Sequence, residues 1–155
     1  MLAVVLVSLA ATTLSCGGGG HLERTNVHVG SATFDAELAL TPAQRSLGLG
    51  GRETLDRDAG MLFVFSTAQR ASFWMKGMRF PLDFVWISGD KRVIQLTEGV
   101  PPPDAGTADA ALPLYKPDQP VRYMLEINAG IAAELGIRVG AAVTFEPEVD
   151  TTRAR

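Results

Sequence analysis

The sequence predicts a mainly β fold, a single compact antiparallel β-sandwich or barrel-like domain with two short helices. Apolar runs of strand length, alternating or continuous, recur along most of the chain. Gly- and Pro-containing turns separate these runs, and helical signals are confined to two short segments. A chain of 155 residues that is 46% hydrophobic is long enough to form one domain with a substantial core.

The N-terminal segment differs from the rest of the chain. Its first 15 residues, "MLAVVLVSLAATTLS", are apolar and uncharged but too short to span a bilayer, and Cys16 and four glycines follow. This pattern indicates an export signal and resembles the lipobox of bacterial lipoproteins, which implies lipidation of Cys16. Thr13 departs from that motif, which usually has a leucine-like residue there, and an ordinary secretory signal with an incidental cysteine is the alternative.

The domain organisation follows from this segment. We expect a signal segment at 1–15, a Cys/Gly-rich tether at 16–22, one β-rich domain at 23–149 and a tail at 150–155. The protein would be exported to the periplasm or cell envelope and held at the membrane by a lipid anchor at Cys16. The formal net charge of −3 and the lack of a basic run argue against nucleic-acid binding. We expect a monomer.

The predicted strands can be read in chain order. They are "NVHVG", "ATFDAELAL", "GMLFVF", "ASFWMK", "LDFVWI", "RVIQLT", "VRYMLEI" and "AAVTFE". Gly89 and Asp90 tolerate the positive φ of a tight turn, so the segments 83–88 and 92–97 should pair as an antiparallel hairpin.

Capping signals predict the two helices. Thr41, Pro42 and Gln44 form an N-cap, a proline at the first helical position and a capping-box partner, and Gly48 ends this helix. Asn128 is expected to cap the second helix, "AGIAAEL", which Gly136 ends.

A Pro-, Asp- and Ala-rich segment separates the last predicted strands. Proline removes ladder donors, so residues 98–120 cannot form a central strand and are expected to form a long surface loop. A functional lid and a mobile connection are both open for a loop of this length.

Several motifs in the right order resemble one family. They are "TPAQRSLGLGGR", "GMLFVF", "SFWMK", "PLDFVWI" and "RYMLEINAG" followed by "LGIRVG", and they resemble the bacterial and archaeal domain of unknown function 192 over residues 27–145. The resemblance implies a compact β-sandwich-like fold and carries no established activity. Gly77 stands where relatives commonly have Asn, Leu49 and Gly50 stand for a Leu-Met pair, and residues 102–113 lack the two cysteines that many relatives have.

Charged residues within otherwise apolar strands suggest a site. Charges in a sheet core are expected only where they are paired or used. The binding hypothesis is a noncatalytic polar pocket for a small polar or anionic compound, a glycan or an envelope partner. Arg45, Lys76 and Arg122 would donate hydrogen bonds, Trp74 or Trp86 would stack, and Asp83 and Glu126 would accept.

Three other interpretations remain open. The charges could form Lys-Asp and Arg-Glu pairs on a solvated face, or the domain could be a purely structural or interaction module. A small envelope hydrolase could use Asp83 and Glu126 if their carboxyl groups lay about 5 to 9.5 Å apart across a cleft.

Other chemistry has little support in the sequence. His21 and His28 are the only histidines and lack metal-ligand spacing, so we expect neither a metal nor a cofactor. The "GLGG" at 48–51 follows a predicted helix and is interpreted as a helix stop and turn rather than a phosphate-binding loop.

Overall fold

The computed structural model describes residues 22–155. The predicted signal segment, Cys16 and nearly all of the predicted tether lie outside the described residues. The described elements are β1 (Arg24–Val29), β2 (Ala32–Ala39), α1 (Pro42–Leu47), β3 (Ala59–Gln69), β4 (Leu82–Ile87), β5 (Val93–Val100), the 3-10 turn η1 (Asp109–Ala111), β6 (Val121–Asn128), α2 (Ile131–Glu134), β7 (Val143–Glu146) and the 3-10 turn η2 (Thr151–Arg153).

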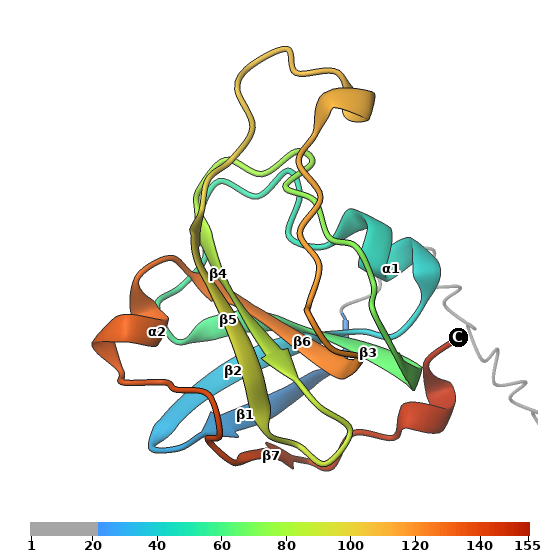
Figure 1. The fold of residues 1–155 in the computed structure, drawn as a ribbon, viewed down its shortest axis with the longest axis vertical. Coiled ribbons are helices and arrows are strands. Elements are labelled where there is room, and N and C mark those ends of the chain that lie inside the picture. Colours follow the sequence, from blue (N-terminus) through green and yellow to red (C-terminus); the bar gives the residue numbers. More distant parts are fainter. Residues whose placement is uncertain (1–21) are drawn as a thin grey trace, which may run out of the picture.

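The strands form one curled seven-stranded sheet in the order β5-β4-β6-β3-β2-β1-β7 (Figure 1). The predicted mainly β, barrel-like class with two short helices is confirmed. Every neighbouring pair is antiparallel except β2 and β3, which run parallel. A parallel pair needs a crossover connection, and the chain from β2 to β3 supplies it through α1.

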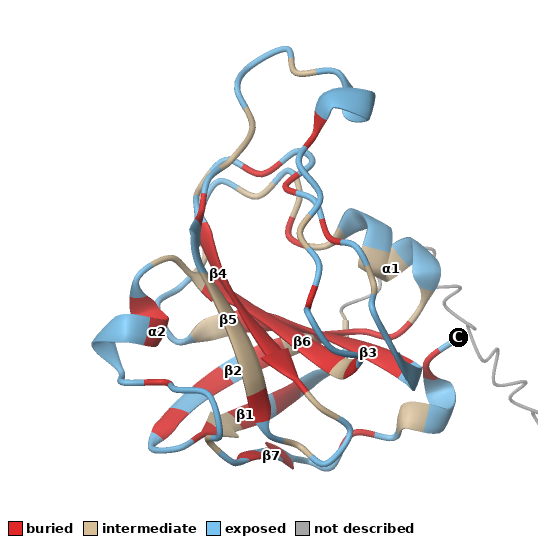
Figure 2. Ribbon diagram, in the orientation of Figure 1, coloured by how far each residue is buried: buried red, intermediate tan, exposed pale blue. Residues whose placement is uncertain are grey.

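Both faces of the central strands are buried (Figure 2). In β4 all six residues are buried, and the apolar ones alternate between two apolar clusters. Phe84 and Trp86 belong to one cluster, and Val85 and Ile87 belong to the other. The two clusters therefore lie on opposite faces of the curled sheet, so a charged side chain on either face of β4 or β6 is enclosed.

The first helix and the hairpin follow the sequence prediction. Thr41 accepts from the backbone N–H of Gln44, the Gln44 side chain accepts from the N–H of Thr41, and Gly48 is the C-cap. Strands β4 and β5 pair antiparallel as predicted. The residue with positive φ in their turn is Lys91, at 58°, and not Gly89 or Asp90, to which the sequence prediction assigns that role.

Two predicted elements need correction. The second helix begins at Ile131 with Gly130 as its N-cap. Asn128 does not cap it, and its side-chain amide donates instead to the carbonyls of Leu55 and Asp56. The expected strand "ASFWMK" is reduced to one antiparallel bridge between Phe73 and Tyr115. The expected alternation of buried and exposed side chains is still present in this segment, because Phe73 is buried and Trp74 is exposed.

The residues expected to form a C-terminal tail pack against the domain. Arg153 pairs with Glu23, Ala154 is buried in the core, and the N–H of Arg155 donates to the carbonyl of Leu40. The folded unit therefore includes residues 150–155.

The long loop is present where the sequence predicts it. Residues 101–120 connect β5 to β6, contain the turn η1 and the bridge residue Tyr115, and extend beyond the sheet (Figure 1). Residues 98–100, which were also expected in the loop, belong to β5. Within residues 22–155, no helix has both the length and the apolar character needed to cross a membrane.

Candidate functional site

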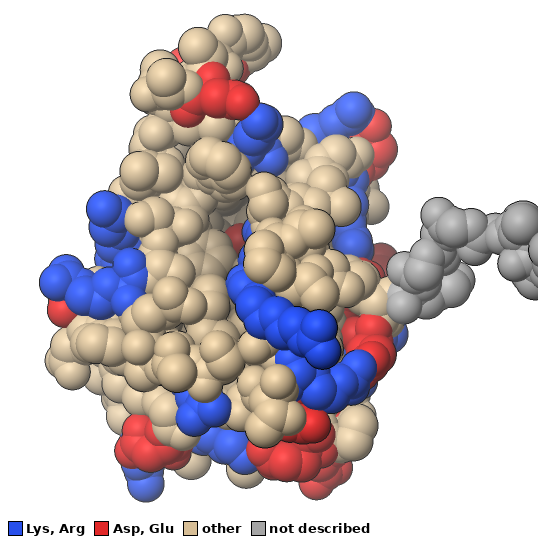
Figure 3. Space-filling model, turned by 90° about the vertical axis from the view of Figure 1, so that its right-hand side faces the viewer, with Lys and Arg blue, Asp and Glu red and all other residues tan. Residues whose placement is uncertain are grey.

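A cavity of about 240 Å³ lies between α1 and the segment 71–78, above β3 and β6. The side of the molecule that carries α1 is hollowed, with basic side chains beside the hollow (Figure 3). Helix α1 and its C-terminal turn form one wall, and the segment that follows β3 forms the other. The lining residues are Arg45, Ser46, Leu47, Gly48, Leu49, Phe63, Phe65, Ala71, Ser72, Phe73, Trp74, Lys76, Met78 and Glu126.

The cavity walls are mainly apolar and aromatic. Phe73 is at their centre, with its ring 5.0 Å from that of Phe63 in an edge-to-face arrangement. Two lining side chains are large, apolar and open to solvent, since Leu47 is 68% and Trp74 is 38% exposed. The cavity thus has an aromatic interior and exposed apolar side chains on its wall.

Glu126 is the acidic residue of this lining. It comes from β6, is only 4% exposed, and forms no side-chain hydrogen bond or ion pair with any other residue between 22 and 155. A Cβ placed on Gly48 would lie 4.0 Å from its Oε2 atom, so the carboxyl faces the C-terminal turn of α1. Burial raises the pKa of Glu126 to about 8. The carboxyl group is therefore mostly protonated at neutral pH and is available to a molecule in the cavity.

Arg45 comes from the last turn of α1 and is held by backbone carbonyls. Its guanidinium donates to the carbonyls of Leu40 at 2.7 Å and Val64 at 3.1 Å, and also to that of Arg155. It also lies 5.2 Å from the ring centroid of Phe65, within cation–π range. Burial lowers its pKa. Arg45 thus fixes α1 to the sheet and places a positive charge in the cavity wall that is paired with no Asp or Glu side chain of residues 22–155.

Lys76 and Trp74 lie on the opposite wall. The Lys76 ammonium is 5.7 Å from the Trp74 ring and forms an ion pair with Asp109 of η1. This pair connects the long loop to the cavity wall. The alternative stacking residue, Trp86, is fully buried and donates its indole N–H to Thr97.

The remaining two predicted site residues lie outside the cavity lining. Asp83 accepts hydrogen bonds from the backbone N–H groups of Gly99 at 2.8 Å and Ala132 at 3.0 Å. Arg122 donates to the carbonyl of Ser66 and to the hydroxyl of Thr151. The structure therefore brings together Arg45, Trp74, Lys76 and Glu126 and leaves Asp83 and Arg122 out.

This placement also bears on the alternative interpretations. Glu126 lies opposite Phe84 in the pairing of β4 and β6, so Asp83 and Glu126 point to opposite faces of the sheet. The single cleft that a paired-carboxylate hydrolase requires is not formed by these two residues. The Lys-Asp pair that is formed is Lys76 with Asp109 instead of with Asp83.

The sequence profile of DUF192, a family described as "Uncharacterized ACR", matches residues 24–145. The chain belongs to the DUF192 family. This agrees with the resemblance carried by its motifs and spans most of the described structure. A search of curated proteins gives no match.

Two solved structures support the fold of this DUF192 domain. A crystal structure from Sinorhizobium meliloti 1021, provisionally described as a transcription regulator, is 29% identical, with a TM-score of 0.74 over 83% of this chain and 98% of that one. A protein of unknown function from Novosphingobium aromaticivorans DSM 12444 is 30% identical, with a TM-score of 0.72 over 82% of this chain and 89% of that one.

The glycine turn of the DUF192 domain contributes more to the site than the sequence prediction assigned to it. It is a helix stop and turn, as predicted, and it also joins the two cavity walls. The N–H of Gly51 donates to the carbonyl of Gly77 at 2.8 Å. A Cβ on Gly50 would lie 2.9 Å from the carbonyl oxygen of Leu47 and 3.0 Å from that of Lys76, so only glycine fits there without displacement. Gly77 has a φ of 70°, a conformation that Asn, the residue expected from the family resemblance, also tolerates.

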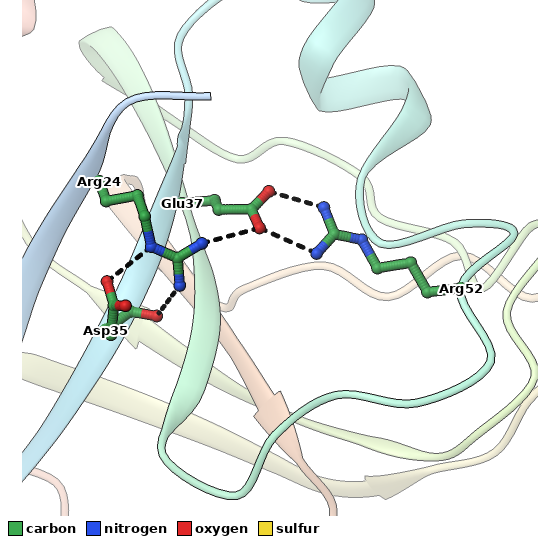
Figure 4. Close-up of polar contacts among 4 residues, drawn as sticks. All are labelled: Arg24, Asp35, Glu37 and Arg52. Carbon is green, nitrogen blue, oxygen red and sulfur yellow. Dashed lines mark hydrogen bonds and ion pairs between the residues drawn. The ribbon is translucent and has the colours of Figure 1, made fainter. Parts of the chain in front are cut away.

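A charge cluster that the sequence analysis did not predict anchors the chain after this turn (Figure 4). Both terminal nitrogens of Arg52 donate to Glu37 of β2, and Arg24 of β1 donates to Glu37 and Asp35. The hydrogen bond from Arg52 is the main reason that the pKa of Glu37 is lowered. Arg52 directly follows "GLGG", but nothing in the local sequence indicates its partner on β2.

Between residues 22 and 155, no three His, Cys, Asp or Glu side chains come close enough together to hold a metal ion.

Proposed function

We propose that this DUF192 domain is a noncatalytic binding module that takes a small ligand into the cavity between α1 and residues 71–78. The unpaired, buried carboxyl of Glu126 in an aromatic cavity is the observation that carries the proposal. Because this carboxyl opens to the cavity and has no partner among residues 22–155, its hydrogen-bonding capacity is available to a ligand.

The composition of the cavity supports this function. Small-molecule sites are commonly concave and mostly apolar, with a few converging polar groups that fix the orientation of the ligand. Here the polar groups are Glu126, Lys76 and Arg45, and Trp74 offers a partly exposed ring for stacking. A glycan or a projecting group of an envelope partner would use the same features and would contact Leu47 and Trp74 at the outside of the cavity.

A thermal-shift screen of polar, anionic and saccharide compounds tests the proposal. Binding to the folded state raises Tm by mass action. We expect at least one compound to stabilise the wild type but not Ser72→Trp, in which an indole enters the cavity from an exposed position on its wall. The matched control is Ser31→Trp, which places the same side chain on an exposed turn away from the cavity lining. Compounds that stabilise both tryptophan variants equally would contradict the proposed site.

We further propose that the module is exported and held at the cell envelope by a lipid on Cys16. The apolar segment 1–15 followed by Cys16 and four glycines supports this proposal. Metabolic labelling with a fatty-acid analogue should mark the wild type and leave Cys16→Ser unlabelled. Equal labelling of the two proteins, or none in either, would contradict it.

A further inference from the structure

The chemical class of the ligand follows from the groups that surround Glu126. We propose that the cavity takes an organic anion with a small planar apolar body, and that an acidic oxygen of this anion accepts a hydrogen bond from the Glu126 carboxyl. This inference rests on the proposed function of the cavity as a ligand site.

The charges around Glu126 favour an anion over a cation. In the described structure, Arg45 from α1 and Lys76 from the segment 71–78 are the other charged side chains of the lining. The strands beside Glu126 place Met61 and Phe84 opposite it, and neither side chain titrates. Lys76 has Asp109 as a counter-ion, whereas Arg45 donates to backbone oxygens of Leu40, Val64 and Arg155 and pairs with no Asp or Glu side chain of residues 22–155. An entering molecule therefore meets two basic side chains and the Glu126 carboxyl, with no other acidic side chain in the lining.

The carboxyl group of Glu126 can supply the hydrogen bond that an anion needs. Because burial raises its pKa to about 8, it keeps its proton at neutral pH and acts as an O–H donor. Hydrogen bonds from a hydroxyl to a charged oxygen are short and roughly twice as strong as neutral ones. Two carboxyl groups that share a site also hold one proton between them, so a bound anion raises the pKa of Glu126 further.

The volume and the aromatic walls of the cavity limit the size and shape of the apolar part of the ligand. An apolar cavity of about 150 Å³ accommodates benzene, so one of about 240 Å³ has room for a ring with a short acidic arm. Phe63 and Phe73 lie on the lining for edge or face contacts with that ring.

Phenylacetate, phenylacetamide and phenethylamine are suitable probes, because they share one ring and differ mainly in the charge of the arm. Each is titrated calorimetrically into the 155-residue chain between pH 6 and 9.5. We expect phenylacetate to bind at pH 6 to 7 and to lose affinity about tenfold per pH unit above the pKa of Glu126 in the free protein. The affinity for phenylacetamide should not fall in this way as pH rises. Preferential binding of phenethylamine, or no binding of phenylacetate at any pH, would overturn the inference.

A variant separates the role of Glu126 from that of the cavity. In Glu126→Gln an amide N–H replaces the acidic donor, so the affinity for phenylacetate should no longer change across this pH range. A pH dependence that persists unchanged in Glu126→Gln would overturn the inference. The proposed function survives that result if another compound from the screen is still blocked by Ser72→Trp, and fails if no compound is.

Discussion

Asp83 and Glu126 lie on neighbouring strands, yet their carboxyl groups occupy opposite faces of the sheet and differ in their partners. Asp83 accepts two backbone N–H groups. Glu126 is paired with no side chain or backbone group of residues 22–155 and lines the cavity. One buried carboxyl is therefore used by the fold, and the other is left for a ligand.

This difference predicts opposite results for two amide substitutions. Asp83→Asn keeps one acceptor oxygen but turns an amide N–H toward a backbone donor, so we expect a loss of roughly 1 to 3 kcal/mol in the free energy of unfolding. Glu126→Gln should be neutral at pH 6 because the native acid is already uncharged. Urea denaturation of both variants measures this, and equal destabilisation by both would contradict the assigned roles.

Glu126 also predicts how stability changes with pH. Its pKa is raised to about 8 in the folded state, so between about pH 4.5 and 8 the folded chain holds a proton that the unfolded chain has lost. The free energy of unfolding should fall as pH rises through this range and level off above it. Each unit by which the pKa is raised corresponds to about 1.4 kcal/mol in the free energy of unfolding, so the total change is up to a few kcal/mol. The measurement is the difference between wild type and Glu126→Gln at pH 5, 7 and 9, and a difference that does not change with pH would refute the assignment.

Two basic residues with different surroundings should differ in their effect on Tm. Arg122 bonds to Ser66 and Thr151, so Arg122→Ala should cost roughly 1.5 to 3 kcal/mol and several degrees of Tm. Lys76 is exposed and its ion pair is solvated, so Lys76→Ala should change Tm little. Differential scanning calorimetry compares the two variants, and a large loss in Lys76→Ala would mean that its ion pair with the loop is structural.

The pair of Arg52 and Glu37 predicts sensitivity to acid. Arg52 lowers the pKa of Glu37 in the folded state. The stabilising effect of this charge pair is therefore present above the ordinary pKa of a glutamate, and it is lost as pH falls through the lowered pKa of Glu37. Arg52→Ala should therefore be less stable than wild type at pH 7, and the gap should narrow toward pH 3. A gap that stays constant over this range would show that packing, and not the charge pair, is lost in the variant.

The sequence was sufficient for features that depend on local chemistry. The capping box of Thr41 and Gln44, the stop at Gly48 and the hairpin of β4 and β5 involve residues a few positions apart, and each was predicted. Alternation also placed Phe84 and Trp86 on one face of their strand and Asp83 on the other.

The remaining features depend on long-range pairing. Alternation within a strand separates its two faces, but it does not say which residues of β6 lie on the same side of the sheet as Asp83. The register between β4 and β6 decides this. Asn128 was expected to cap a helix, but it bonds to Leu55 and Asp56, which are more than 70 residues away. The cluster of Arg52 with Glu37 and the parallel pair of β2 and β3 have the same origin.

The carboxyl pKa of Glu126, measured by carbon-detected NMR on the wild-type chain, tests the central claim most directly. A side chain that is buried, unpaired and open only to the cavity should titrate near pH 8. A pKa between 4 and 5 would show a solvated or paired carboxyl and would contradict the site proposed for this domain.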